Sequence, residues 1–183
     1  MSHRALLVMD IQRAIVDRIP DPGYLPRLRG AVDAARSADI PVIYVVLGFR
    51  AGHPEVSARN QRFGGLAGSG AFAEGDPGAR IHPDVAPRPG DVVVTKKRVS
   101  AFTGSDLDLV LRAGGVGQLV LTGVATSGVV LSTLRQAADL DFELTVLADG
   151  CADADPEVHR VLTEKVFPRQ AEVLTVAQWA AAR

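Results

Sequence analysis

The chain alternates between short apolar runs and longer segments in which apolar residues recur every three or four positions. The short runs are rich in Val, Ile and Leu, with few polar residues between them. Such uninterrupted runs are typical of strands that are buried on both faces of a parallel sheet. The predicted strands cover residues 4–9, 41–47, 91–95, 119–121, 143–147 and 171–175.

The segments between these runs have the periodicity of helices. In the first of them, Leu25, Leu28, Val32 and Ala35 share one face of the predicted helix. The predicted helices cover residues 24–38, 105–113, 129–138, 156–167 and 176–182, with Gly104 or Ser105 as the N-cap of the second and Gly114–Gly115 as its stop. Strand–helix alternation along residues 1–183 predicts a single three-layer α/β/α domain with a six-stranded, parallel, Rossmann-like sheet.

Residues 48–90 do not fit this alternation. They are rich in Gly and Pro, with one short helix predicted near 56–63. A segment of that length without regular structure is usually functional or disordered. Its apolar residues favour an ordered excursion: Phe49, Phe63, Leu66 and Phe72.

Composition narrows the class of protein. A formal net charge of −1 gives no electrostatic case for a nucleic-acid or membrane partner. No apolar run is long enough to span a bilayer, and the first run does not resemble a secretion signal. The single cysteine, Cys151, fits a reducing compartment. No Gly-x-Gly-x-x-Gly follows the first strand, which argues against a dinucleotide. We expect a cytoplasmic protein with a small-molecule substrate and no cofactor.

Polar side chains and turns follow several predicted strands. Asp10 follows the first, Lys96 the third, the turn 123–129 the fourth and residues 149–151 the fifth. Since ligands bind beyond the carboxyl ends of parallel strands, these residues are expected to meet. Taken alone, Asp10 is as consistent with a helix N-cap as with a site residue. Lys96 alone is more typical of a solvated strand end.

Together these segments resemble the isochorismatase-like (cysteine hydrolase) family. Leu-Leu-Val-Met-Asp-Ile-Gln at 6–12 is similar to its first motif, and Lys96-Lys-Arg-Val-Ser-Ala-Phe102 to its second. Residues 123–133 and 148–153 are similar to its later motifs. The resemblance covers nearly the whole chain and implies a homodimer or homotetramer.

The resemblance also implies an Asp–Lys–Cys triad, in which Asp10 and Lys96 match and Val129 stands at the position of the cysteine. It implies a cis peptide bond at Val124–Ala125, and an oxyanion hole formed by the backbone N–H groups of Ala125 and Val129. Ser127 and Gly128 lie in the same turn.

Valine cannot act as a nucleophile, so three interpretations stay open. Asp10 and Lys96 act on the substrate and water without a covalent intermediate, or another residue such as Cys151 supplies the nucleophile, or catalysis is lost and the domain binds small molecules or serves in assembly. We favour a buried, structural Cys151. Ser127 is expected to point away from the site.

Further expectations concern the substrate and metal. Nicotinamidase-type members of the family bind a metal through an Asp-x-His motif. This sequence lacks that motif, so we expect no metal. Leu47 stands where isochorismatase-type members carry a glutamine, which argues against isochorismate itself. His53, Arg59 and Asn60 suit a substrate contact or a solvated loop equally well. The predicted substrate-binding residues are Gln12, Leu47, Phe49, Arg50 and Phe102. The expected reaction is hydrolysis of an amide, or of a vinyl ether or ester.

Overall fold

The computed structural model describes residues 3–182 and contains one six-stranded, fully parallel sheet in the order β3-β2-β1-β4-β5-β6. This confirms the predicted three-layer α/β/α fold. The strands are β1 (His3–Met9), β2 (Val42–Leu47), β3 (Val92–Lys96), β4 (Val116–Val124), β5 (Glu143–Ala152) and β6 (Glu172–Leu174).

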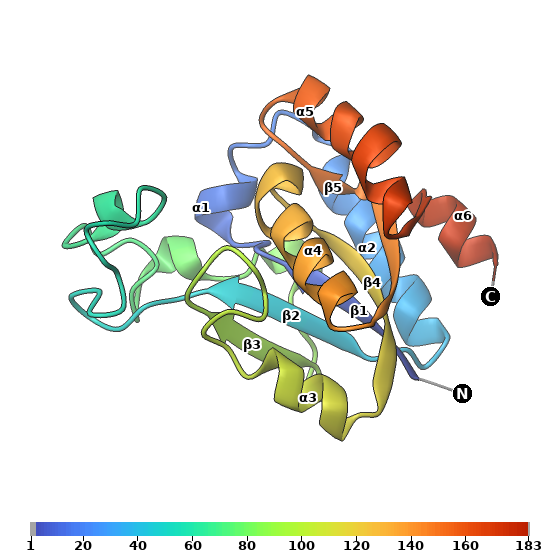
Figure 1. Ribbon diagram of the computed structural model, residues 1–183, viewed down its shortest axis with the longest axis horizontal. Coiled ribbons are helices and arrows are strands. Elements are labelled where there is room, and N and C mark those ends of the chain that lie inside the picture. The colour runs from blue at the N-terminus through green and yellow to red at the C-terminus, as the bar shows by residue number, and fades with distance from the viewer. Residues whose placement is uncertain (1–2, 183) are drawn as a thin grey trace.

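The helices cover both faces of the sheet (Figure 1). Helices α1 (Arg13–Val16), α2 (Tyr24–Ser37) and α6 (Val176–Ala181) pack on one face. Helices α3 (Leu107–Ala113), α4 (Leu131–Asp139) and α5 (Pro156–Val161) lie toward the other. The helix that begins as α5 continues through a wider turn, η5 (Leu162–Val166), and a tight one, η6 (Phe167–Arg169), so the predicted helix over 156–167 is confirmed with a change of winding.

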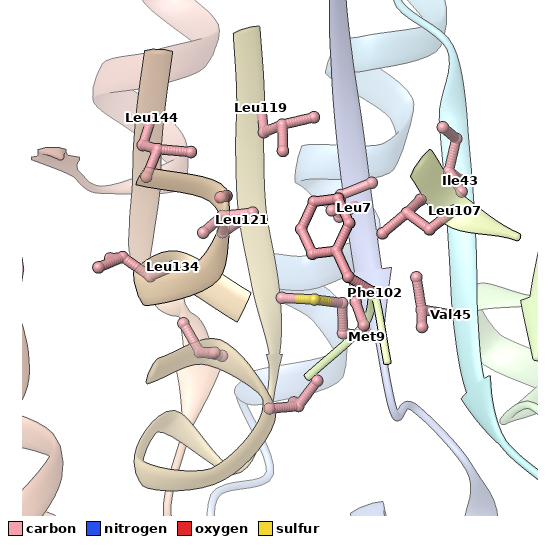
Figure 2. Close-up of a cluster of buried hydrophobic side chains, with 14 of the residues drawn as sticks. Leu7, Met9, Ile43, Val45, Phe102, Leu107, Leu119, Leu121, Leu134 and Leu144 are labelled. Atoms are coloured by element: carbon pink, nitrogen blue, oxygen red, sulfur yellow. The ribbon is translucent and has the colours of Figure 1, made fainter. Parts of the chain in front are cut away.

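Two buried clusters result from the alternation of side chains along the strands. Leu7 and Met9 of β1 face the cluster beneath α3 and α4, where Ile43, Val45 and the Phe102 ring join them (Figure 2). The intervening β1 residues face α2 and α6 instead. The central strand is therefore buried on both faces, as its uninterrupted apolar run predicted.

Some predicted boundaries were wrong. Helix α3 begins at Leu107 with Asp106 as its N-cap, not at Gly104 or Ser105. The Ser105 hydroxyl donates to Ala101 O at 2.6 Å and accepts from Leu107 N at 3.3 Å, so it holds a turn before the helix. Strands β4 and β5 extend well beyond the predicted runs, with an irregular register between Leu121 and Gly123.

Residues 48–90 form an ordered arm that projects beyond the carboxyl end of β2 (Figure 1). Phe49 and Phe63 are buried together with Leu47, which agrees with the predicted ordered excursion. The predicted helix near 56–63 is wrong. Asn60 Oδ1 accepts from Arg62 N and Phe63 N, a side-chain bond that competes with helical backbone pairing. Three short 3₁₀ turns occur later: η1 (Gly64–Leu66), η2 (Pro77–Ala79) and η3 (Pro83–Val85).

Within residues 3–182, no helix combines the length and the apolar character that crossing a membrane requires.

Candidate active site

Asp10 and Lys96 meet at the carboxyl edge of the sheet. Asp10 directly follows β1, its N–H donates to Val45 O at 2.8 Å, and its φ of 58° is uncommon for a residue other than glycine. Lys96 ends β3, two strands away, and its Nζ lies 3.0 Å from Asp10 Oδ2. The same ammonium donates to Arg98 O at 2.9 Å. The structure thus brings together the two residues that sequence alone left ambiguous.

This ion pair is almost completely removed from solvent. Asp10 is 7% exposed and Lys96 is 1% exposed. Burial raises the pKa of Asp10 above its ordinary value, while the positive charges of Lys96 and Arg62 act in the opposite direction. Asp10 Oδ1 is buried and has no hydrogen-bond partner among residues 3–182. The carboxylate therefore keeps one oxygen for a proton, a water molecule or a ligand.

The end of β4 lies against Met9, the residue before Asp10, and leads into the turn. A Cβ atom at residue 123 would lie 2.5 Å from Met9 O, and Gly123 has a φ of +148°. Only glycine fits at this position. The peptide bond Val124–Ala125 is cis, as the resemblance implied. The first helical turn is the wide π turn η4 (Thr126–Val130), in which Gly128 N and Val130 N both donate to Ala125 O. The role of the Ala125 and Val129 N–H groups as oxyanion donors stays a prediction.

Val129 belongs to the same buried cluster as Met9 and Phe102 and is 2% exposed. Met9 precedes Asp10, and Phe102 lies in the loop that follows Lys96. An apolar side chain thus occupies the expected position of the nucleophile. Ser127 is exposed, in line with its predicted orientation away from the site.

The turn is held from outside by α5 and the loop before it. Thr126 Oγ1 lies 2.8 Å from His159 Nδ1, and Ser127 N donates to Asp153 Oδ2 at 2.7 Å. Burial lowers the pKa of His159, and the Asp153 charge raises it. Sequence reasoning missed both partners. Asp153 belongs to the family-like motif at 148–153, but only the fold shows that its side chain contacts the turn.

Cys151 is buried and 3% exposed. Burial raises the pKa of its thiol to about 12, and its Sγ points to Leu121 O at 3.9 Å. These features favour the structural interpretation of this cysteine.

The predicted substrate-binding residues have varied surroundings. Gln12 is fully buried: its amide nitrogen donates to Leu47 O and Ala79 O, and its oxygen accepts from Leu47 N, each at 2.8 Å. Its polar atoms therefore join the segment after β1 to the end of β2 and to Ala79 of the arm. Arg50 is exposed and pairs with Glu55, at 2.7 Å between Nη1 and Oε1.

The aromatic candidates and Leu47 are also buried. Phe49 packs edge-on against Phe63, with ring centroids 5.9 Å apart, and Phe102 packs 6.0 Å from the Phe142 ring. His53 Nε2 lies 2.8 Å from Ala71 O within the arm. Substrate binding by this set stays a prediction.

An open cavity of about 390 Å³ lies between the ends of β2 and β3 and the arm. Its lining includes Val46 and Thr95, Lys97 just after β3, and two of the predicted substrate-binding residues, Leu47 and Phe49. Asp10, Lys96 and Val129 do not line it, so it is separate from the ion pair. In the described part of the chain, no group of three or more His, Cys, Asp or Glu side chains is arranged to hold a metal ion.

Known proteins resemble this chain in sequence and in fold. The isochorismatase domain model matches residues 4–178. The chain is similar to the ureidoacrylate amidohydrolase RutB of Stutzerimonas stutzeri, at 34% identity over 85% of this chain and 72% of that protein. The cysteine hydrolase from Pseudomonas syringae shares the fold, with a TM-score of 0.90 at 23% identity over 98% of this chain and 91% of the other.

N-carbamoylsarcosine amidase from Thermoplasma acidophilum is also similar, with a TM-score of 0.77 and 25% identity over 95% of this chain and 96% of that one. The domain match spans β1 to α6 and includes Asp10, Lys96 and the turn that carries Val129. The chain therefore belongs to the isochorismatase family.

Proposed function

We propose that the protein is an amidohydrolase that cleaves a C–N bond of a small molecule by direct attack of water. The observation that carries the proposal is the buried Asp10–Lys96 pair, joined at 3.0 Å, with Asp10 Oδ1 unpartnered among the described residues. The ureidoacrylate amidohydrolase, similar in sequence, and the N-carbamoylsarcosine amidase, similar in structure, support the choice of a C–N bond.

The proposed reaction needs a base, an electrophilic carbonyl and a stabilised oxyanion. Asp10 removes a proton from water, and the water oxygen attacks the amide carbon. The carbonyl oxygen becomes an oxyanion that the backbone N–H groups of Ala125 and Val129 stabilise. When the C–N bond breaks, Asp10 returns the proton to the leaving nitrogen. The products are a carboxylic or carbamic acid and an amine or ammonia.

Lys96 acts on the base in this scheme. Its ammonium holds Asp10 Oδ2, which leaves Oδ1 as the basic oxygen. The raised pKa of Asp10 suits a group that both accepts and returns a proton.

None of the three nucleophile candidates considered among residues 3–182 supports a covalent route. Val129 has none, the Ser127 side chain is exposed, and the Cys151 thiol has a pKa of about 12. Protonation of a vinyl ether by Asp10, followed by capture of water, would also need no nucleophile. The alternative function is a binding or assembly module without catalysis, which the close packing around Val129 favours.

The test is release of ammonia or amine from a panel of ureido acids and simple amides, compared with release of a carbonyl product from vinyl ethers. We expect C–N cleavage that survives Cys151→Ala and falls at least about a hundredfold in Asp10→Asn and in Lys96→Met, the scale of losing a general base. Equal activity in all three variants would contradict the proposal. Binding without turnover of any compound would favour the non-catalytic module.

A further inference from the structure

Arg62 lies on a part of the arm that is fixed to the rim of the site. Asn60 Oδ1 accepts from Arg62 N at 3.1 Å and from Phe63 N at 3.0 Å. Phe63 is 4% exposed and packs in one cluster with Leu47 at the end of β2. Val99, three residues after Lys96, packs against the same cluster. The backbone at residue 62 is thus anchored to the two segments that flank the ion pair.

The Arg62 side chain differs from Arg50 and Arg98 in having no partner for its guanidinium within the described part of the chain. It is exposed, and its guanidinium makes no hydrogen bond or ion pair with residues 3–182. By contrast, Arg50 pairs with Glu55, and Arg98 donates to the carbonyls of Lys97 and Glu55. Arg50 is thus tied up within the arm and Arg98 ties the arm to the loop after β3, whereas the Arg62 guanidinium is available to a ligand.

The positive charge of Arg62 acts on Asp10, whose pKa it lowers against the effect of burial. Lys96 and Asp10 neutralise each other across 3.0 Å. The charge of Arg62, which no ion pair within residues 3–182 neutralises, therefore remains to attract an anionic substrate that approaches the ion pair. An arginine fork matches a carboxylate in shape and in hydrogen-bond donors.

We propose that Arg62 binds a carboxylate of the substrate and so selects amides that carry this group a few bonds from the scissile carbonyl. The inference rests on the proposed function, in which hydrolysis takes place at Asp10. One cation and one planar fork suit a single carboxylate better than a phosphate, whose two negative charges call for several donors.

The test compares N-carbamoylglycine and N-carbamoyl-β-alanine with neutral alkylureas of the same shape, such as isopentylurea for the second. In Arg62→Ala we expect kcat/KM for the ureido acids to fall about tenfold to a hundredfold, mainly through KM, the scale of losing a hydrogen bond to a charged group. At a pH above the acid limb of the profile, kcat/KM for the neutral ureas should be unchanged in Arg62→Ala, and Arg62→Lys should recover part of the loss for the ureido acids. Arg59→Ala is the matched control, because it removes an equal charge from an exposed position of the same arm.

Calorimetric binding of the same compounds separates this inference from the proposed function. If nothing is hydrolysed but the ureido acids bind and Arg62→Ala weakens them selectively, the hydrolase proposal fails and the role of Arg62 stands. If Arg62→Ala leaves the preference for the carboxylate unchanged, the inference is overturned. An equal loss of affinity for the ureido acids in Arg59→Ala would show that the charge of the arm as a whole attracts them, and would overturn a direct contact with Arg62. If no ureido acid binds at all, the inference is overturned as well.

Discussion

Lys96 Nζ lies 3.0 Å from Asp10 Oδ2, although less than a tenth of either side chain is exposed. Removing one charge of a buried pair leaves the other without a partner, which typically costs about 3–5 kcal/mol. Replacing both with neutral groups avoids most of that cost. The pair is therefore expected to show strong coupling in stability as well as in activity.

Lys96→Met should lower the free energy of unfolding by about 3–5 kcal/mol, because it leaves the Asp10 carboxyl buried without its cation. Adding Asp10→Asn to this variant should restore most of the loss. Urea unfolding of the two single variants, the double variant and the wild type measures the coupling. Additive effects in this cycle would show that the two groups do not interact at the strength that their geometry indicates.

The pH profile of hydrolysis should carry the signature of Asp10. Burial raises the pKa of this carboxyl, and only the ionised form accepts a proton from water. As the pH falls through that raised pKa, kcat/KM should fall with it, at a higher pH than an ordinary aspartate would give. Arg62→Ala removes one of the two charges that lower this pKa, so the acid limb should move to still higher pH. Profiles measured with a neutral urea isolate this effect from substrate binding, and an unmoved limb would exclude Arg62 from the field at Asp10.

The reactivity of thiols tests the position of Val129. In a Cys151→Ala background, Val129→Cys places a thiol where the family resemblance expects the nucleophile. Lys96 should lower the pKa of that thiol, so iodoacetamide at pH 8 should modify it at least about tenfold faster than it modifies Cys151 in the wild type, whose pKa is about 12. Mass spectrometry follows the alkylation. A thiol at residue 129 as inert as Cys151 would indicate a closed pocket and favour the non-catalytic module.

Much of the fold follows from the sequence because it depends on local patterns. Buried β-branched runs specify β1 and β2, and the Gly114–Gly115 stop specifies the end of α3. Asp10 and Lys96 could be paired in advance because the carboxyl ends of parallel strands share one edge. The failures have a different cause. Ser105 and Asn60 form side-chain bonds that compete with helix formation, and periodicity does not show such bonds.

The rest of the site depends on contacts between distant parts of the chain. Gln12 resembled a substrate ligand, but its amide bonds the backbone of Leu47 and Ala79. Arg62 lacks any distinguishing motif, and only the packing of Phe63 with Leu47 and Val99 fixes its backbone at the carboxyl edge of the sheet. These relationships arise from tertiary structure, so no reading of local spacing could supply them.

The contact between Thr126 and His159 is expected to make the stability of the turn depend on pH. The pKa of His159 is lowered by burial in the folded protein, so the unfolded chain, with a pKa of about 6.5, binds this proton more readily. As the pH falls below about 6.5, the free energy of unfolding should therefore fall, until the folded state also takes up the proton. We expect the loss of stability between pH 7.5 and pH 5.5 to be smaller in His159→Gln than in the wild type, measured by urea unfolding.

Thr126→Val is the matched control for this last effect, since it removes the hydroxyl at 2.8 Å and leaves the imidazole in place. Loss of one buried hydrogen bond should cost about 1 kcal/mol at both pH values. If hydrolysis depends on the geometry of the turn, both variants should lower kcat more than they raise KM. Equal pH dependence of stability in His159→Gln and the wild type would show that the imidazole titrates in the folded protein as it does in the unfolded chain, and that the turn is not its sensor.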